Sequence, residues 1–325
     1  MKRTAFVAAT AASAALAALG SRAAAADDTA YAAAISAGTL FGTALVPDAG
    51  TSAAARVPAV LIVAGSGPTD RDGNSGTVLR TDCYRLLAEA LRASGIASVR
   101  YDKRGVGAST AALHDESEVH FDDLVADVVA WIAKMRADTR FGKIGIAGHS
   151  EGSTIGMIAA LSTQADAFIS LEGPGFPAAE TLRRQLSVAL AATPQLEEQS
   201  SAILDALVAG KTVADVPAAL AALYRPSVQP YLISWFRRDP RIEIAKLTCP
   251  VAVVQGTADL QVTVDDAKAL VAALPTARAF TIEGLTHPLK HTSDPSPENQ
   301  KATVYIDPAI PIDPAVPAAI TSMFT

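Results

Sequence analysis

A serine between two glycines gives the first indication of chemistry in this sequence. The residues G-H-S-E-G at positions 148–152 follow an apolar run at 144–147 and precede a small-residue stretch with helical character at 153–161. So tight a turn from strand to helix exposes the serine hydroxyl above the edge of a sheet. The backbone N–H of Glu151 then lies at a helix N-terminus, where it can stabilise an oxyanion. The pattern predicts Ser150 as a nucleophile.

A serine hydroxyl needs a base to accept its proton and a carboxylate to hold that base. Asp259 follows an apolar strand pattern at 251–254 and a glycine turn. The ends of such strands are where active-site residues gather in an open α/β sheet. Asp265 and Asp266 are alternatives, but they begin a helical run, where acidic residues stabilise the helix N-terminus. We expect Asp259 to be the acid.

The base should follow the acid, and only two of the five histidines do so. His287 comes directly after the last predicted strand, 278–282, whereas His291 lies four residues further on and is the second candidate. A lone histidine is more often a surface-loop residue, so the choice of His287 depends on the nucleophile and acid that precede it. His149, beside the nucleophile, is expected to point away and pack under the turn.

A second oxyanion donor is expected from the loop after the first long strand, G-S-G-P-T-D-R-D-G at 65–73. Its glycines allow the backbone to approach a substrate, and the N–H of Ser66 is the expected donor. Arg71 is expected to pair with Asp70 or Asp72 and to shape the loop. Taken alone, the run would be interpreted as a plain glycine turn.

The glycine-containing run R-Y-D-K-R-G-V-G-A-S at 100–109 could be mistaken for a phosphate-binding loop. They lack the third glycine of G-x-G-x-x-G, and no helix pattern opens directly after them. We therefore expect a structural turn beside the active site and no nucleotide. The sequence has neither CxxC nor HExxH, so neither a metal nor another cofactor is expected.

These residues must be positioned by alternating strands and helices. Expected strands are 59–63, 96–101, 143–147, 168–171, 251–254 and 278–282, with helices at 83–93 and 122–135 and an edge hairpin around 40–47. The alternation predicts an α/β fold with a mostly parallel, doubly wound sheet. Helical spacing at 177–240 predicts an inserted cap, which divides the core into 27–176 and 241–325. The Pro-rich tail from 288 to 317 should be irregular, with a short closing helix at 315–324.

The N-terminus has the pattern of a secretory signal peptide, 1–26. Lys2 and Arg3 precede an apolar stretch at 5–19, too short to span a bilayer, and small residues end near Ala26. Cleavage there predicts an exported protein, periplasmic or secreted. It removes three basic residues and no acidic one, so the formal charge falls from −6 to −9. An acidic protein without a basic run is a poor candidate for nucleic acid, and no later apolar stretch is long enough for a membrane span.

The two cysteines, Cys83 and Cys249, lie on very different predicted elements. An exported protein could pair them. We favour two buried, unpaired thiols.

Together, the motifs resemble the α/β-hydrolase superfamily, and within it the bacterial serine esterases that group with serine-aminopeptidase-like domains. The matching runs follow the family's order, cover roughly residues 40 to 291, and lie at 65–72, 100–109, 148–152, 255–259 and 284–290. The resemblance implies Ser150 as nucleophile, Asp259 as acid and His287 as base. It also implies the backbone amides of Ser66 and Glu151 as the oxyanion hole.

Two features depart from the family pattern: Ala64 stands where many relatives carry histidine, and the tail after His287 is long and proline-rich. The resemblance implies a serine hydrolase that cleaves small carboxylic esters without a cofactor. A peptidase or amidase, an acyltransferase or thioesterase would use the same triad, and acids such as Glu151 and Glu172 would suit a free-amine subsite. A non-catalytic binding protein on this fold is the alternative from another class. In the cap, Tyr224, Tyr231, Trp235 and Phe236 are expected to be core rather than pocket lining.

Overall fold

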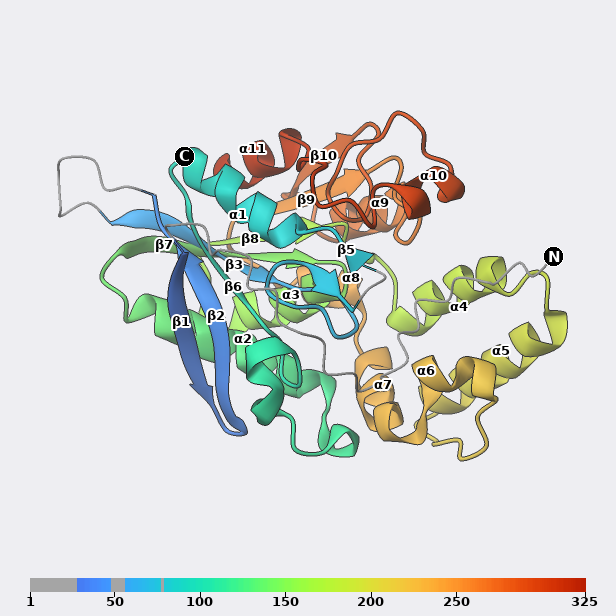
Figure 1. Cartoon of the computed structure of the whole chain (residues 1–325). Coiled ribbons are helices and arrows are strands. Elements are labelled where there is room, and N and C mark those ends of the chain that lie inside the picture. Colours follow the sequence, from blue (N-terminus) through green and yellow to red (C-terminus); the bar gives the residue numbers. More distant parts are fainter. Residues whose placement is uncertain (1–27, 48–55, 77–78) are drawn as a thin grey trace.

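A computed structural model describes residues 28–47, 56–76 and 79–325 (Figure 1). The predicted signal peptide, 1–26, lies outside the described residues. No helix within these ranges is both long and apolar enough to cross a membrane. Both cysteines are free thiols, as expected, but only Cys83 is buried; Cys249 is half-buried, contrary to the expectation.

The centre of the molecule is an eight-stranded sheet in the order β1-β2-β6-β3-β7-β8-β9-β10. The strands are β1 (Asp28–Ile35), β2 (Gly38–Leu45), β3 (Val57–Val63), β6 (Ala97–Tyr101), β7 (Phe141–His149), β8 (Ala167–Leu171), β9 (Val251–Gly256) and β10 (Arg278–Ile282). From β6 to β10 all neighbours pair in parallel, whereas β1 and β2 form an antiparallel edge. The prediction of a mostly parallel α/β sheet is therefore confirmed. A separate two-stranded ribbon consists of β4 (Asn74–Ser75) and β5 (Leu79–Arg80).

Helices cover both faces of this sheet (Figure 1). One face carries α1 (Cys83–Ala93) and α11 (Ala315–Thr321), and the other carries α2 (Phe121–Arg136), α3 (Glu151–Thr163), α8 (Pro240–Ile244) and α9 (Val264–Ala273). Alternate side chains of a strand point to opposite faces. Accordingly, Val60 and Ile62 of β3 pack into the core under α1 and α11, while Leu61 and Val63 pack into the core under α2 and α3.

The edge strand β1 extends the expected hairpin by a full strand. It pairs with β2 along its whole length, from Asp28 opposite Leu45 to Ile35 opposite Gly38. Arg100 of β6 is buried and donates to Asp28 (2.6 Å) and to Asp72 (2.9 Å). Because a buried guanidinium requires paired acids, this arginine ties the edge strand to the loop after β3.

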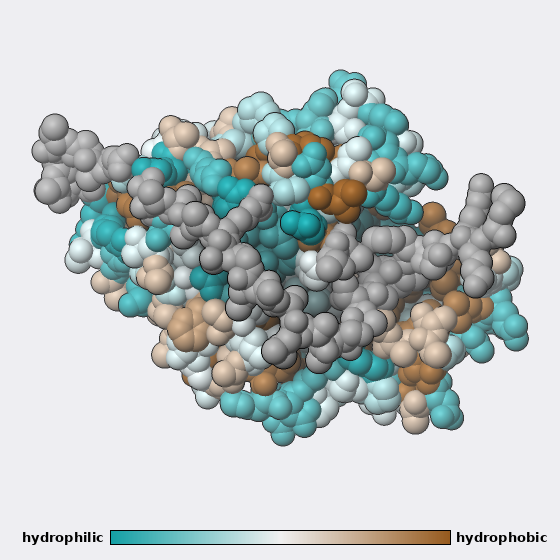
Figure 2. Space-filling model, viewed as in Figure 1, coloured by the Kyte–Doolittle hydropathy of each residue, from teal (hydrophilic) through white to brown (hydrophobic). Residues whose placement is uncertain are grey.

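The segment predicted as a cap contains α4 (Ala178–Ala189), α5 (Pro194–Val208), α6 (Ala221–Tyr224) and α7 (Gln229–Phe236). Figure 1 shows these helices beside one end of the sheet. Tyr224, Trp235 and Phe236 are buried in the core shared with α2 and α3, as expected, whereas Tyr231 is half-buried. Polar residues cover most of the face in Figure 2, and apolar residues form separate groups, some of them over the cap helices.

The Pro-rich tail is less irregular than expected, because it contains α10 (Pro297–Ala302) before α11. It also contacts the loop that follows β9. Gln300 Nε2 donates to the backbone oxygen of Ala258 (2.9 Å), and Gln261 Nε2 donates to the hydroxyl of Tyr305 (3.1 Å). The tail therefore supports the loop on which the predicted acid lies.

Candidate active site

Ser150 lies at the turn between β7 and α3, with φ 54° and ψ −125°. Such a positive φ is uncommon for a residue with a side chain. The flanking glycines are required by space: a Cβ on Gly148 would lie 2.2 Å from the backbone oxygen of Gly152, and one on Gly152 would lie 2.3 Å from that of Val63. The turn therefore presses directly against the end of β3 and holds Ser150 in its strained conformation.

Asp259 and His287 form a buried pair at the ends of β9 and β10. His287 Nδ1 lies 2.7 Å from Asp259 Oδ2, and the N–H groups of Gln261 and Val262 donate to Asp259 Oδ1. Burial by itself would raise the pKa of Asp259, but the charge and hydrogen bond of His287 outweigh it and lower that pKa. The carboxylate is thus ionised and orients the imidazole.

The alternative acids and base lie elsewhere. Asp265 is exposed and pairs with Lys268 on α9, and Asp266 is buried against Arg184 of the cap. His291 faces Asp313 at 3.3 Å.

His149 connects the nucleophile turn to the base. It is buried beneath the turn, its Nε2 lies 2.7 Å from the backbone oxygen of His287, and its Nδ1 lies 2.8 Å from the hydroxyl of Tyr84. A carbonyl can only accept, so Nε2 carries the proton and Nδ1 accepts from Tyr84. Tyr84 in turn accepts the N–H of Gly65 (3.1 Å). Burial, with a smaller contribution from His287, lowers the pKa of His149 to about 3.

The predicted oxyanion loop passes directly over the nucleophile. A Cβ on Gly65 would lie 3.0 Å from the Cβ of Ser150, so the loop approaches as closely as a glycine permits. Ser66 follows and is exposed. Glu151 is the first residue of α3, and the first N–H groups of a helix have no partner within the helix. The two predicted donors therefore flank Ser150.

A second carboxyl group, Glu172, lies beside Asp259. It is fully buried at the end of β8, accepts the N–H of Gly256 (2.9 Å) and a side-chain N–H of Gln255 (2.5 Å), and shares a hydrogen bond with Asp259. Burial and the charge of Asp259 raise the pKa of Glu172 well above its ordinary value. Glu172 is therefore the neutral member of the pair and donates its proton to Asp259. The sequence indicated only an acid near a strand end.

Three further polar side chains meet behind the oxyanion loop. Lys103 Nζ donates to the backbone oxygen of Gly65 (2.6 Å) and lies 4.0 Å from Glu151 Oε2. Tyr231 of α7 donates its hydroxyl to the other oxygen of Glu151. Burial raises the pKa of Glu151 and lowers that of Lys103, in each case against the charge of its partner. Sequence patterns gave no signal for this cluster beyond placing 100–109 beside the site.

The expected pairing of Arg71 with Asp70 or Asp72 is wrong. Arg71 pairs with Asp102 at 2.6 Å. Asp70 instead accepts backbone N–H groups of its own turn, and Asp72 forms an ion pair with the buried Arg100. The loop is therefore fixed by Asp70 within its own turn and by the ion pairs of Asp72 with Arg100 and of Arg71 with Asp102.

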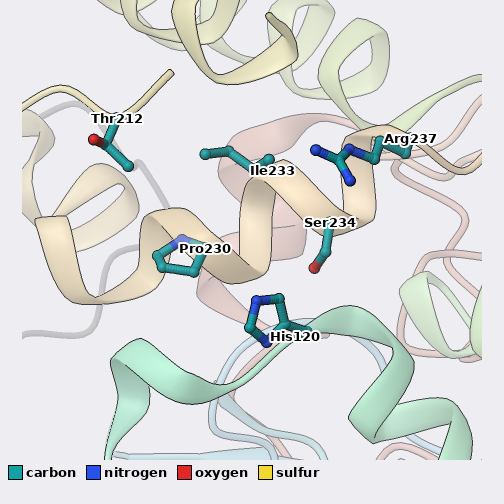
Figure 3. Close-up of a pocket in the computed structure, with 6 residues that line it drawn as sticks. All are labelled: His120, Thr212, Pro230, Ile233, Ser234 and Arg237. Atoms are coloured by element: carbon teal, nitrogen blue, oxygen red, sulfur yellow. The ribbon is translucent and has the colours of Figure 1, made fainter. Parts of the chain in front are cut away.

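A surface cavity of about 250 Å³ lies between the start of α2 and α7 and is separate from the triad (Figure 3). Its lining residues are His120, Thr212, Pro230, Ile233, Ser234 and Arg237. Across the described ranges, no cluster of three or more His, Cys, Asp or Glu is arranged to hold a metal ion.

Comparison with known proteins shows which proteins this chain is similar to. Residues 74–230 match the family described as serine aminopeptidase, S33. Esterase EstD from Thermotoga maritima is 30% identical over 213 residues, which are 64% of this chain and 48% of EstD. The chain thus spans about half the length of this curated relative. The matched family region contains Ser150 but ends before Asp259 and His287.

Solved structures give the same fold. Est1E from Butyrivibrio proteoclasticus has a TM-score of 0.57 at 17% identity, covering 91% of this chain and 97% of Est1E. A puromycin-hydrolysing peptidase from Mycobacterium tuberculosis has a TM-score of 0.55 at 16% identity, covering 80% of this chain and 36% of the peptidase. The chain has the α/β-hydrolase fold, as its motifs predicted. In sequence it is similar to the serine-aminopeptidase family and to an esterase.

Proposed function

We propose that the protein is a serine hydrolase that cleaves carboxylic esters through an acyl-enzyme on Ser150. The observation that carries this proposal is the buried pair of His287 and Asp259, 2.7 Å apart, at the sheet end where the strained turn presents Ser150. The similarity to an esterase over 64% of the chain favours the ester as substrate class.

In the proposed reaction, His287 Nε2 accepts the hydroxyl proton as Ser150 Oγ bonds to the ester carbonyl carbon. The carbonyl electron pair moves to oxygen, and the backbone N–H groups of Ser66 and Glu151 hold the resulting oxyanion. When the tetrahedral species collapses, the bond to the leaving alkoxide breaks and His287 returns the proton to it. Water then attacks the acyl-enzyme by the same steps. Asp259 accepts the Nδ1–H throughout, which fixes the tautomer and stabilises the imidazolium.

A peptidase is the second candidate, because residues 74–230 match the serine aminopeptidase family. A free-amine subsite would need acids open to the substrate. Glu172 is fully buried and bonded to Asp259, and Glu151 is buried and bonded to Tyr231. Neither carboxyl group considered for this role from the sequence is therefore available to an amine, which favours the ester.

The deciding experiment measures hydrolysis of p-nitrophenyl acetate, butyrate and octanoate beside a panel of aminoacyl-nitroanilides. Ser150→Ala should lower ester turnover by about 10⁶-fold. Ser162→Ala, an exposed position on the same helix α3, is the matched control and should leave turnover unchanged. Cleavage of the anilides would favour the peptidase, and transfer of the acyl group to an added alcohol in preference to water would favour an acyltransferase. If no substrate is turned over and a fluorophosphonate does not label Ser150, the hydrolase is contradicted and the non-catalytic binding protein is favoured.

We also propose that helices α4 to α7 act as a cap that selects the substrate, and that the protein is exported after cleavage near Ala26. The cap is supported by its position at the sheet end beside the site and by the contact of Tyr231 with Glu151. Export is supported by the basic, apolar and small-residue pattern of positions 1–26. N-terminal sequencing of protein from the periplasm or medium should begin at Asp27. Protein retained in the cytoplasm with its N-terminus intact would contradict export.

A further inference from the structure

Gly65 is held at both of its backbone polar groups. Its N–H donates to the hydroxyl of Tyr84 (3.1 Å), and its carbonyl oxygen accepts from Lys103 Nζ (2.6 Å). Tyr84 and Lys103 are themselves buried, with 3% and 8% of their surfaces exposed. This residue, on which a Cβ would come within 3.0 Å of the Ser150 Cβ, is thus fixed by two side chains from different elements.

The hydrogen bond from Lys103 to the Gly65 carbonyl determines where the N–H of Ser66 points. The bond between Gly65 and Ser66 is planar and trans, so this carbonyl and the N–H of Ser66 belong to one rigid unit and point in opposite directions. A side chain that draws the carbonyl to one side therefore aims the N–H of Ser66 to the other. A charged donor on the carbonyl also polarises the amide and makes its N–H a stronger donor.

The position of Lys103 has an electrostatic cost that only its neighbours offset. A buried ammonium needs a counter-charge, and Glu151 Oε2 lies 4.0 Å away. Glu151 is held in turn by the hydroxyl of Tyr231 from the cap. The buried pair of Lys103 and Glu151 therefore serves both predicted oxyanion donors. Lys103 binds the carbonyl of the peptide that carries the Ser66 N–H, and Glu151 supplies the other N–H itself.

We propose that Lys103 is a positioning residue for the oxyanion hole: it holds the Gly65 carbonyl so that the N–H of Ser66 faces the developing oxyanion. The inference rests on the proposed function, because an oxyanion forms only if Ser150 attacks a carbonyl. Lys103 itself touches neither substrate nor nucleophile in this role. Through Glu151 and Tyr231, its position also depends on the cap.

The test compares an ester with the thionoester of the same acyl group and alcohol, in which sulfur replaces the carbonyl oxygen. Sulfur is a weak hydrogen-bond acceptor, so the thionoester gains little from an oxyanion hole. Lys103→Met should lower kcat for the oxygen ester by about 10²-fold, the order lost with one oxyanion donor, with KM nearly unchanged. The thionoester rate should fall much less. Lys268→Met, an exposed lysine on α9, is the matched control and should change neither.

Equal losses on the two substrates would show a general structural role for Lys103 and overturn the inference, as would an unchanged rate. If Lys103→Met does not fold, Lys103→Arg gives the same comparison, because it keeps the positive charge beside Glu151 but displaces the donor from the Gly65 carbonyl. In Lys103→Arg too, the rate for the oxygen ester divided by the rate for the thionoester should be lower than in wild type. A ratio equal to that of wild type would again overturn the inference. A wild-type protein that cleaves neither ester removes the proposed function, and this inference with it.

Discussion

Replacing Glu172 by glutamine tests the assignment of protons in the acid pair. Glu172 is fully buried, bonds to Asp259 and accepts the N–H of Gly256. Since burial and the charge of Asp259 raise its pKa well above the ordinary value, Glu172 is neutral in the folded protein. Glutamine has nearly the same shape, can donate to Asp259, and carries no titratable proton.

The magnitude follows from proton linkage. Above the ordinary value of 4.5, the unfolded chain has released the Glu172 proton that the folded protein still holds. The free energy of unfolding of wild type then loses about 1.4 kcal/mol for each pH unit, until the pH passes the raised pKa. Glu172→Gln lacks this contribution. Its stability relative to wild type should therefore rise by about 1.4 kcal/mol per pH unit from pH 4.5 upward.

Urea denaturation of both proteins between about pH 4.5 and 7.5 measures the difference directly, because most other titrating groups cancel. Glu198→Gln, at an exposed position on α5, is the control for removing one carboxyl group. A difference between Glu172→Gln and wild type that stayed constant over this range would mean that Glu172 is ionised in the folded protein, and the reasoning would be refuted.

Three further predictions concern the groups around the base. Asp259→Asn should lower kcat for p-nitrophenyl butyrate by about 10⁴-fold, because the Nδ1–H of His287 loses its acceptor; a loss below tenfold would contradict the triad. Tyr84→Phe leaves the N–H of Gly65 and the Nδ1 of His149 buried without a partner, so urea denaturation should show a loss of about 2–5 kcal/mol. His149, with its pKa lowered to about 3, stays neutral when folded while the unfolded chain gains a proton below pH 6.5. The free energy of unfolding should therefore decrease by up to about 1.4 kcal/mol for each unit by which the pH is lowered below 6.5, and by less in His149→Gln. Equal slopes in the two proteins would show that His149 is not a buried neutral histidine.

Local sequence patterns were sufficient to predict the strands and the candidate site residues that follow them. All six strands expected from apolar runs are present, each within two positions at either end. Ser150, Asp259 and His287 each come directly after such a strand, and parallel strands bring their carboxyl ends to one edge. Their proximity therefore follows from topology, which the alternation of elements already determines.

The missing parts of the site depend on contacts between distant segments. Lys103 meets Gly65 across 38 positions, and Glu172 meets Gln255 across 83, so no spacing in the sequence relates them. The pairing expected for Arg71 was wrong because Asp70 accepts N–H groups of its own turn, Asp72 pairs with the distant Arg100, and Arg71 itself meets Asp102. Short-range charge patterns indicate which groups are present but not which of them meet.

The insertion between β8 and β9 has a consequence for how this protein could diverge. Parallel neighbours such as these strands need a crossover, and α8, packed on α3 and α9, already supplies it. Residues 177–239 are therefore additional to the connectivity of the sheet. A lineage could lengthen, shorten or exchange this segment while the strand ends that carry the reacting groups stay in place. Such an exchange would have to preserve or replace the contacts that anchor this segment, among them the bonds of Tyr231 to Glu151, Arg184 to Asp266 and Arg225 to Glu116.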